Sequence, residues 1–317
     1  MVQPTRHTRV GRAIGLLLAG IMAGLGLDLC AKGILATYPL EQFVFLRSLI
    51  GVLLFLMLAR RFGGLGSLRT RRWGWHLLRT ALATGAMFGF FYGLSKMPLV
   101  DALTLGFTAP LMVTALSRPL LGEQVGWRRW CAVLAGFAGV LMILRPGGGD
   151  LSPAVFAVLL AAFCYACLAL TARRLAATES TFAMSVYVIA GPLLVSAIVS
   201  IDGAWLVPDA VGWLLFVLAG ACSVGAWIGI VGGYRLAPPA LLAPFEYTAL
   251  VAGAIAGYLI WGEVPDRWVV AGAATIIASG IYIVHREVGA AATLRYLRVM
   301  TSGAAAMLSR RRRSGRV

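Results

Sequence analysis

The stretch that decides the fold lies at residues 238–263 and reads PPALLAPFEYTALVAGAIAGYLIWGE. It is long and apolar enough to cross a bilayer as a helix, for which about 20 residues suffice. Within it, Glu246 stands between Pro244 and Tyr247. A carboxylate inside such a helix costs about 2.5–3.5 kcal/mol on insertion, so it tends to face a cavity or a partner. The stretch therefore predicts a membrane-spanning helix with a functional acid at Glu246.

The same pattern occurs 140 positions earlier in the chain. Pro98, Thr108, Gly122 and Ile143 each have an identical residue 140 positions later, and Gly122 is followed by glutamate at both places. The coincidence falls on the proline that opens the helix and on the Gly-Glu pair that closes it. Because internal repeats are a signature of whole architectures, we predict that the chain is built from a duplicated unit.

The composition excludes a water-soluble globular protein. Of the 317 residues, 60% are hydrophobic and 13% charged, and the mean hydropathy is +0.86. A net charge of +16 would suit a nucleic-acid binder, but such a protein gathers its basic residues on one accessible face. Here they fall mainly between apolar segments and at the two ends, as in membrane proteins. We predict an integral membrane protein with no nucleic-acid partner.

Ten apolar segments have the length of a membrane span. The first is too long for a signal peptide and contains Asp28 and Lys32, so we predict that it is retained as a helix. The ten segments lie at residues 13–35, 42–59, 75–94, 99–120, 126–144, 153–171, 182–201, 211–233, 238–260 and 267–284.

Lysine and arginine are distributed unevenly between the two sides that these spans define. If the amino terminus is cytoplasmic, 22 of the 28 fall on the cytoplasmic side and four on the outside. This asymmetry is the one that orients membrane proteins, and it predicts that both termini are cytoplasmic.

Each half of the chain holds five spans, an odd number, so the second half enters the bilayer upside down relative to the first. We therefore predict an all-α integral membrane protein with ten transmembrane helices in two inverted five-helix repeats, at 13–145 and 153–286, joined by a linker at 146–152. Residues 1–12 form a basic cytoplasmic amino terminus. Residues 287–317 form a basic cytoplasmic tail, either as a short helix lying on membrane lipid or as an unstructured segment. Inverted repeats are associated with secondary transporters.

Three motifs carry a resemblance to a known family: GEQ at 122–124, APFEYT at 243–248 and WGEVP at 261–265. With the ten spans, they resemble the EamA-type branch of the drug/metabolite transporter superfamily over roughly residues 13–286. The resemblance implies a monomeric or homodimeric inner-membrane carrier with a small-molecule substrate in a central cavity between the halves. Members of this superfamily carry amino acids, nucleotides and their derivatives, vitamins or drugs, and some import while others export.

Two charged residues are the main candidates for substrate binding. Glu246 would bind a cationic group or take up a proton as coupling ion; the alternative is a structural carboxylate paired with a neighbouring helix. Arg47 matches an arginine common at this place in the family, and its guanidinium would clamp a carboxylate or phosphate. Its alternatives are a structural pair with Glu41 or snorkelling to the outer interface. Pro244 would kink its helix and free a carbonyl group.

The remaining candidates are one acid and three aromatic residues. Asp28 either faces the cavity or pairs with Lys32, which lies four residues later on the same helix face. Tyr92, Trp227 and Tyr247 lie on helices that would line the cavity by the resemblance, and their rings suit a planar or cationic substrate. The alternative for each ring is packing.

Three further residues have structural expectations. Arg79 is expected to snorkel to the inner interface. Glu123 and Glu263 recur at the loop that closes each repeat and are expected to act as caps or loop anchors.

No catalytic, metal-binding or cofactor-binding motif accompanies these residues. The glycines after Pro146 lack the lysine and hydroxyl residue that make a phosphate loop, and Cys164 and Cys167 have no second pair to complete a metal site. We therefore expect a secondary active transporter of an amino-acid derivative, nucleoside conjugate or vitamin-like compound, working by alternating access. The alternatives are a membrane-embedded enzyme or accessory scaffold, and a passive channel, which would need a continuous polar stripe.

Overall fold

The computed structural model of the chain describes residues 6–58, 70–122, 126–144, 152–175, 178–201, 203, 205–236, 242, 245–283 and 285. These residues form helices and connecting turns, and no β-strand occurs among them. The predicted all-α membrane class is confirmed. A helix suits a bilayer because it satisfies its backbone hydrogen bonds within the segment itself.

Each of the ten predicted spans coincides with a helical segment in these ranges. The helices are α1 (Arg6–Leu35), α2 (Leu40–Leu58), α3 (Trp73–Lys96), α4 (Leu99–Gly106), α5 (Ala109–Leu121), α6 (Trp127–Leu144), α7 (Pro153–Leu175), α8 (Thr181–Val199), α9 (Ala210–Leu236), α11 (Thr248–Trp261) and a further helix, Arg267–Ile283. Counting α4 and α5 as one span, eight have the length and hydropathy to cross a membrane. The other two described helices, α11 and Arg267–Ile283, are shorter and apolar.

Two predicted spans are interrupted near their middle. The span expected at 99–120 divides into α4 and α5, with turn residues at Phe107 and Thr108. In the span expected at 238–260, a turn at Tyr247 precedes α11. Pro244, the predicted kink, lies outside the described residues. Discontinuous helices in transporters free backbone groups near the binding site. Both breaks therefore indicate where a binding site should be sought.

The two interrupted spans share their local chemistry at an offset of 140 residues. Thr108 Oγ1 donates to the carbonyl of Leu105 at 2.7 Å, and Thr248 Oγ1 donates to the carbonyl three residues before it at 2.6 Å. Gly122 and Gly262 end α5 and α11 with φ of 72° and 68°. Only glycine adopts this left-handed conformation without a Cβ penalty, which explains why glycine recurs at this position.

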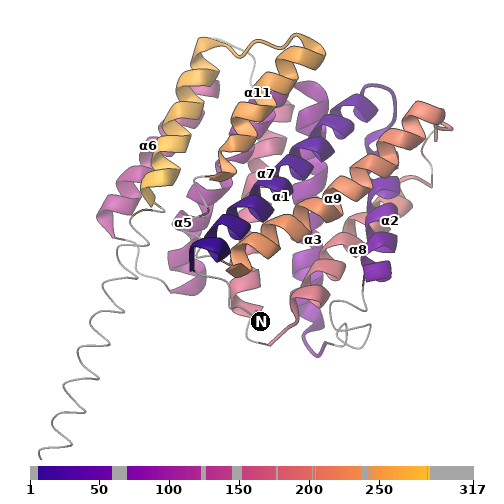
Figure 1. Ribbon diagram of the computed structural model, residues 1–317, viewed down its shortest axis with the longest axis horizontal. Helices are drawn as coiled ribbons and strands as arrows, with labels where there is room; N and C mark the ends of the chain where they lie inside the picture. The colour runs from indigo at the N-terminus through magenta and orange to yellow at the C-terminus, as the bar shows by residue number, and fades with distance from the viewer. Residues whose placement is uncertain are drawn as a thin grey trace, which may run out of the picture.

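The most extensive helix contacts join the two halves of the chain: α1 packs on α9, and α3 packs on α7 (Figure 1). The 140-residue offset makes α7 the equivalent of α1, α8 the equivalent of α2, and α9 the equivalent of α3. Exchanging each helix for its equivalent converts the α1–α9 contact into the α7–α3 contact. The α2–α9 and α3–α8 contacts exchange in the same way, and α2–α8 maps onto itself. This is the pattern expected of two repeats related by a pseudo-two-fold axis.

Glycines let these helices approach at backbone distance. A Cβ on Gly229 of α9 would lie 2.5 Å from Gly20 Cα, and a Cβ on Gly89 of α3 would lie 2.6 Å from the carbonyl oxygen of Ala157. Gly89 and Gly229 are again 140 residues apart, and both begin a G-x-x-x-G pair that ends at Gly93 or Gly233. Small residues at this spacing are typical of close helix packing in membranes.

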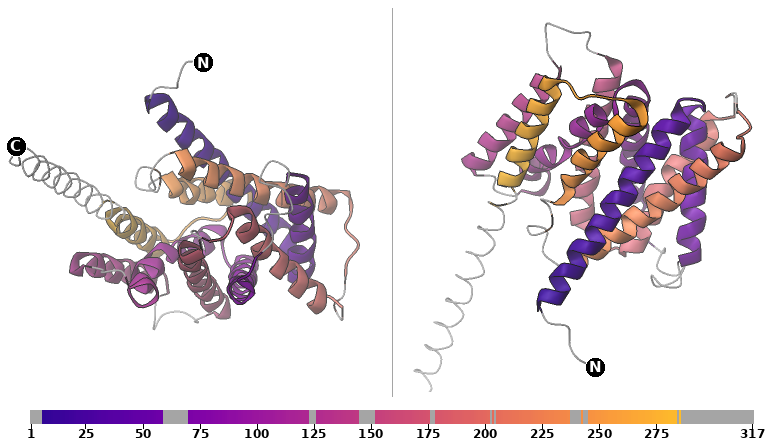
Figure 2. Two further views of the ribbon diagram at one scale, coloured as in Figure 1. Left: turned by 90° about the horizontal axis from the view of Figure 1, so that it is seen from below. Right: turned by 45° about the horizontal axis from the view of Figure 1, so that its top comes forward.

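The helix Arg267–Ile283 lies beside α6 at one edge of the molecule in all three views (Figures 1 and 2). The centre is therefore formed by α1, α3, α7 and α9, with α4, α5 and α11 between the centre and that edge.

Candidate functional site

A cavity of about 500 Å³ lies between α2, α3, α4, α5, α7 and α8. This volume is within the usual range of small-molecule sites, about 300–1,000 Å³. Its walls are mostly alanines and the rings of Phe90, Phe91, Phe107 and Tyr165. Two charged residues line it, Arg47 and Glu246, which are 199 positions apart in the sequence and belong to different predicted repeats.

Glu246 is held by a hydroxyl group rather than by a positive charge. Tyr234 on α9 donates its phenolic hydrogen to Glu246 Oε1. Tyr165 and Tyr247 lie close enough to interact electrostatically with the same carboxylate. None of the lysine or arginine side chains that the structure describes lies within 4.0 Å of it. Glu246 is thus tied to the neighbouring helix α9 by a hydrogen bond, as the structural alternative supposed. Its negative charge, however, is not paired with a described basic side chain.

Arg47 is surrounded by soft and aromatic groups. Its Nη1 lies 3.0 Å from Met87 Sδ, and its Cζ lies 5.7 Å from the centre of the Phe91 ring. Its Nε is buried without a hydrogen-bond partner. Within the described ranges no ion pair joins Arg47 to Glu41, the structural partner that we considered. A buried guanidinium without a bound carboxylate is a ready site for an anionic group.

Asp28 on α1 lies beyond the cavity lining but near Arg47, with which it interacts electrostatically. The alternative considered for Asp28, a pair with Lys32, is not among the ion pairs of the described residues. Lys32 instead forms an ion pair with Glu263, donates to the carbonyl of Met97 at 3.1 Å, and lies 5.2 Å from the centre of the Trp261 ring. The reason is packing, since α1 presents Lys32 to the loop that follows α11.

Glu263 acts as the loop anchor that its repeated position predicts. One carboxylate oxygen receives Lys32, and the other accepts the backbone N–H of Leu99 at 2.8 Å, at the start of α4. This carboxylate therefore satisfies a free amide of one half from the loop of the other. Its counterpart Glu123 lies outside the described residues.

The predicted aromatic residues separate into two groups. Tyr247 lies beside the cavity, with its ring 5.3 Å from that of Phe107, its equivalent at the 140-residue offset. Tyr92 is 38% exposed and does not line the cavity. Trp227 also lies outside the lining and packs edge to face on Phe55 at 5.0 Å.

The sequence reasoning did not select three residues that the structure brings to the site. Tyr165 and Phe107 line the cavity, and Tyr234 holds Glu246. The 140-residue offset from Tyr247 would have pointed to Phe107. No local pattern marks Tyr165 or Tyr234, because their positions depend on how α7 and α9 pack.

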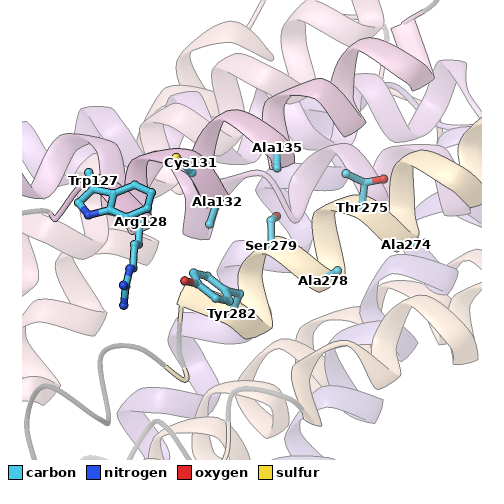
Figure 3. A pocket seen from close by; sticks show the side chains of 10 residues that line it. All are labelled: Trp127, Arg128, Cys131, Ala132, Ala135, Ala274, Thr275, Ala278, Ser279 and Tyr282. Carbon is cyan, nitrogen blue, oxygen red and sulfur yellow. The ribbon is translucent and has the colours of Figure 1, made fainter.

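A second cavity lies between α6 and the helix Arg267–Ile283 (Figure 3). Four of its ten lining residues are alanines, and Trp127, Arg128 and Tyr282 stand at one end. Both helices come from the edge of the molecule. This second cavity is lined by no described acidic residue and borders only these two edge helices. The first cavity is therefore the better candidate for a binding site.

The chain matches a family model described as the EamA-like transporter family over residues 12–145. It is also 30% identical to the S-adenosylmethionine uptake transporter of Rickettsia bellii over 281 residues, which cover 86% of this chain and 94% of that protein. The chain belongs to the EamA-like transporter family. It is thus a multi-pass membrane protein of a bacterial transporter family, and the predicted superfamily is confirmed.

Two further transporters are similar to this chain over most of their length. The riboflavin transporter of Vibrio cholerae is 32% identical over 240 residues, 75% of this chain and 80% of that protein. The pseudopaline exporter of Pseudomonas aeruginosa is 30% identical over 262 residues, 80% of this chain and 89% of that protein. A crystal structure of another protein, 20% identical, has a TM-score of 0.62 and covers 85% of this chain and 95% of that one, which shows a shared fold.

Proposed function

We propose that this protein is a secondary active transporter of a small organic metabolite that carries both an anionic and a cationic group. The observation that carries the proposal is the cavity between the halves, which holds Arg47 and Glu246. Neither forms an ion pair with another described side chain. A zwitterionic amino-acid derivative, a nucleoside conjugate or a vitamin-like compound has this chemistry.

In this proposal Arg47 binds the anionic group, and Met87 and Phe91 keep its guanidinium partly dehydrated. Charged hydrogen bonds strengthen in such surroundings because the local dielectric constant is low. Asp28 sets the orientation of Arg47 through its nearby charge. The rings of Phe90, Phe107 and Tyr165 contact a planar part of the substrate.

Glu246 binds the cationic group or, in its absence, takes up a proton. Tyr234 orients the carboxylate in both states by its hydrogen bond. If the proton and the substrate compete for Glu246, a proton gradient drives substrate movement. This coupling is part of the proposal.

Transport proceeds by alternating access between two inverted repeats, at 13–145 and 153–286. The exchange symmetry of the helix pairs and the matching glycines Gly122 and Gly262 support this division. Both breaks in the spans, at Thr108 and Tyr247, border the cavity region, so movement of α5 and α11 about them would open one side at a time. The distribution of lysine and arginine supports an inner-membrane location with both termini in the cytoplasm.

The named relatives include uptake transporters for S-adenosylmethionine and an exporter for pseudopaline. S-adenosylmethionine and riboflavin, the latter carried by a further named relative, therefore come first in the panel of substrates. The alternative function is a membrane-embedded enzyme or accessory scaffold. A protein of that kind would move no solute across the membrane. We propose neither a catalytic activity nor a cofactor for this protein.

The test is uptake and efflux in vesicles of purified protein, with labelled S-adenosylmethionine, riboflavin, amino acids and cationic dyes, with and without a pH gradient. We expect saturable flux of one compound. Loss of a charged hydrogen bond costs about 1.5–3 kcal/mol, so Arg47→Gln and Glu246→Gln should each weaken its binding about 10- to 100-fold. Arg72→Gln and Glu41→Gln, which lie outside the cavity, serve as matched controls. Folded protein without flux across the panel would instead favour the scaffold or enzyme.

A further inference from the structure

The cavity face of α3 continues toward the amino end of that helix. Ala83 and Met87 line the cavity and are four residues apart, so they lie on one face. Arg79 is four residues before Ala83 and thus occupies the next turn of the same face. On the opposite wall, Leu168 of α7 lines the cavity, and Thr171 lies one turn farther on. We call this junction, formed by Arg79, Leu168 and Thr171, the α3–α7 seam.

Arg79 is held inside the seam and does not snorkel as predicted. Its side chain is 5% exposed, and Nη1 donates to the carbonyl of Leu168 at 2.8 Å and to Thr171 Oγ1 at 3.1 Å. Its Nε is buried and has no hydrogen-bond partner. Within the part of the chain that the structure describes, no acidic side chain lies within 4.0 Å of it.

The contrast with Lys32 shows why these contacts do not explain the charge. Lys32 also joins helices of the two halves, and it has the acid Glu263 as its partner. Arg79 donates only to a carbonyl oxygen and a hydroxyl oxygen. A neutral amide side chain could donate the same two hydrogen bonds. A buried charge without a counter-ion is costly, and in a membrane protein it marks a path for ions or substrates.

A second polar layer lies beyond the seam, away from the cavity. His76, one turn before Arg79, lies 3.2 Å from Glu179, which also accepts a hydrogen bond from Thr70 at 2.9 Å. Both members of the His76–Glu179 pair are nearly fully buried. Arg79 thus lies between the cavity and a closed polar contact, where a solute leaving the cavity on this side would have to pass.

We propose that Arg79 is a second anion-binding station, which receives the anionic group of the transported molecule from Arg47 when the α3–α7 seam opens. The inference rests on the proposed transport function and adds a step to it. Arg79 releases Leu168 and Thr171 as α3 and α7 separate, and its guanidinium then has free donors for a carboxylate or another anionic oxygen group. The two arginines divide the path into a cavity site and an exit site.

The test measures the charge at the seam without any substrate. A cysteine is introduced by Ala83→Cys, about 6 Å along the helix from Arg79, in vesicles of the full-length protein. Its reaction rates with anionic sulfonatoethyl methanethiosulfonate and neutral methyl methanethiosulfonate are measured by mass spectrometry of the peptide that contains it. The ratio of anionic to neutral rates reports the local charge that a solute meets.

We expect Arg79→Gln to lower this ratio about threefold or more, the effect of one unit charge about 6 Å away at the dielectric constant of water. Arg79→Lys should keep the ratio, and so should Arg72→Gln, which removes an exposed arginine at the same end of α3. A cysteine introduced by Ala86→Cys, about 10 Å along the helix from Arg79, should show a smaller change. If Arg79→Gln does not fold, Arg79→Met carries the same test, because apolar residues often replace buried charges without loss of stability.

An unchanged ratio in Arg79→Gln, or no reaction with either reagent, would overturn the inference and leave Arg79 as a structural tie between α3 and α7. This outcome is separate from failure of the proposed function, which appears as absence of substrate flux in the unsubstituted protein. Where a substrate is found, Arg79→Gln should lower kcat and leave binding in the cavity within about twofold, whereas Arg47→Gln weakens the binding itself.

Discussion

Replacing Gly229 by alanine tests how closely α1 and α9 pack. A Cβ at this position would lie 2.5 Å from Gly20 Cα and 2.7 Å from the carbonyl oxygen of Leu16. Both are backbone atoms, so no side chain can rotate away and the two helices must separate. Overpacking of this kind costs about 1–3 kcal/mol. Against this, alanine favours the helix over glycine by about 0.5–1 kcal/mol, so we expect a net loss of roughly 1–2 kcal/mol.

The matched control is Gly15→Ala on α1, where the added Cβ has no atom within 4 Å. Here only helix propensity changes, so this variant should be more stable than the unsubstituted protein by about 0.5–1 kcal/mol. The measurement is the thermal unfolding midpoint in one detergent, followed by tryptophan fluorescence. Gly89→Ala should resemble Gly229→Ala, because its Cβ would lie 2.6 Å from the carbonyl of Ala157. A midpoint for Gly229→Ala equal to or above that of Gly15→Ala would refute this account of the packing.

Three further predictions follow from the polar contacts. Glu263→Gln should lower the thermal midpoint through loss of the Lys32 ion pair, and combining it with Lys32→Met in a double-mutant cycle should give a coupling of about 0.5–3 kcal/mol; a coupling of zero would mean that the pair is not formed. Tyr234→Phe removes the hydrogen bond to Glu246 and should weaken substrate binding about 5- to 10-fold with unchanged stability, as measured by equilibrium binding; no change would separate Tyr234 from the site. Glu246→Gln should abolish stimulation of flux by a pH gradient, and flux that keeps its gradient dependence would rule out Glu246 as the proton carrier.

The positions of the spans could be predicted from the sequence because a bilayer imposes local rules. A segment of about 20 apolar residues must form a helix, since lipid offers no partner for its backbone groups. The 140-residue offset could also be read from the sequence. The left-handed turn after each helix requires glycine, so Gly122 and Gly262 occur at matching positions. The break at Thr108 was not predicted, because both of its sides are apolar and the period of the pattern does not change there.

The charged residues of the site could be predicted as candidates but not as an assembly. Arg47 and Glu246 were notable because a charge in an apolar segment is costly wherever it points. That both line one cavity depends on the packing of α2 against α3 and on the turn before α11. For the same reason Tyr92 lies outside the cavity lining although its helix, α3, lines the cavity, and Trp227 lies on α9, which contributes no lining residue.

The sequence by itself thus determined the class of protein, the positions of its apolar helical segments, and the short set of residues whose charges require an explanation. The tertiary structure alone decided which of these residues meet. Lys32 pairs with Glu263, 231 positions away, rather than with Asp28 one turn before it. Arg79 is enclosed at the α3–α7 seam rather than extended to the interface. The physical reason is that partner choice within a membrane depends on distances across packed helices, which local periodicity does not encode.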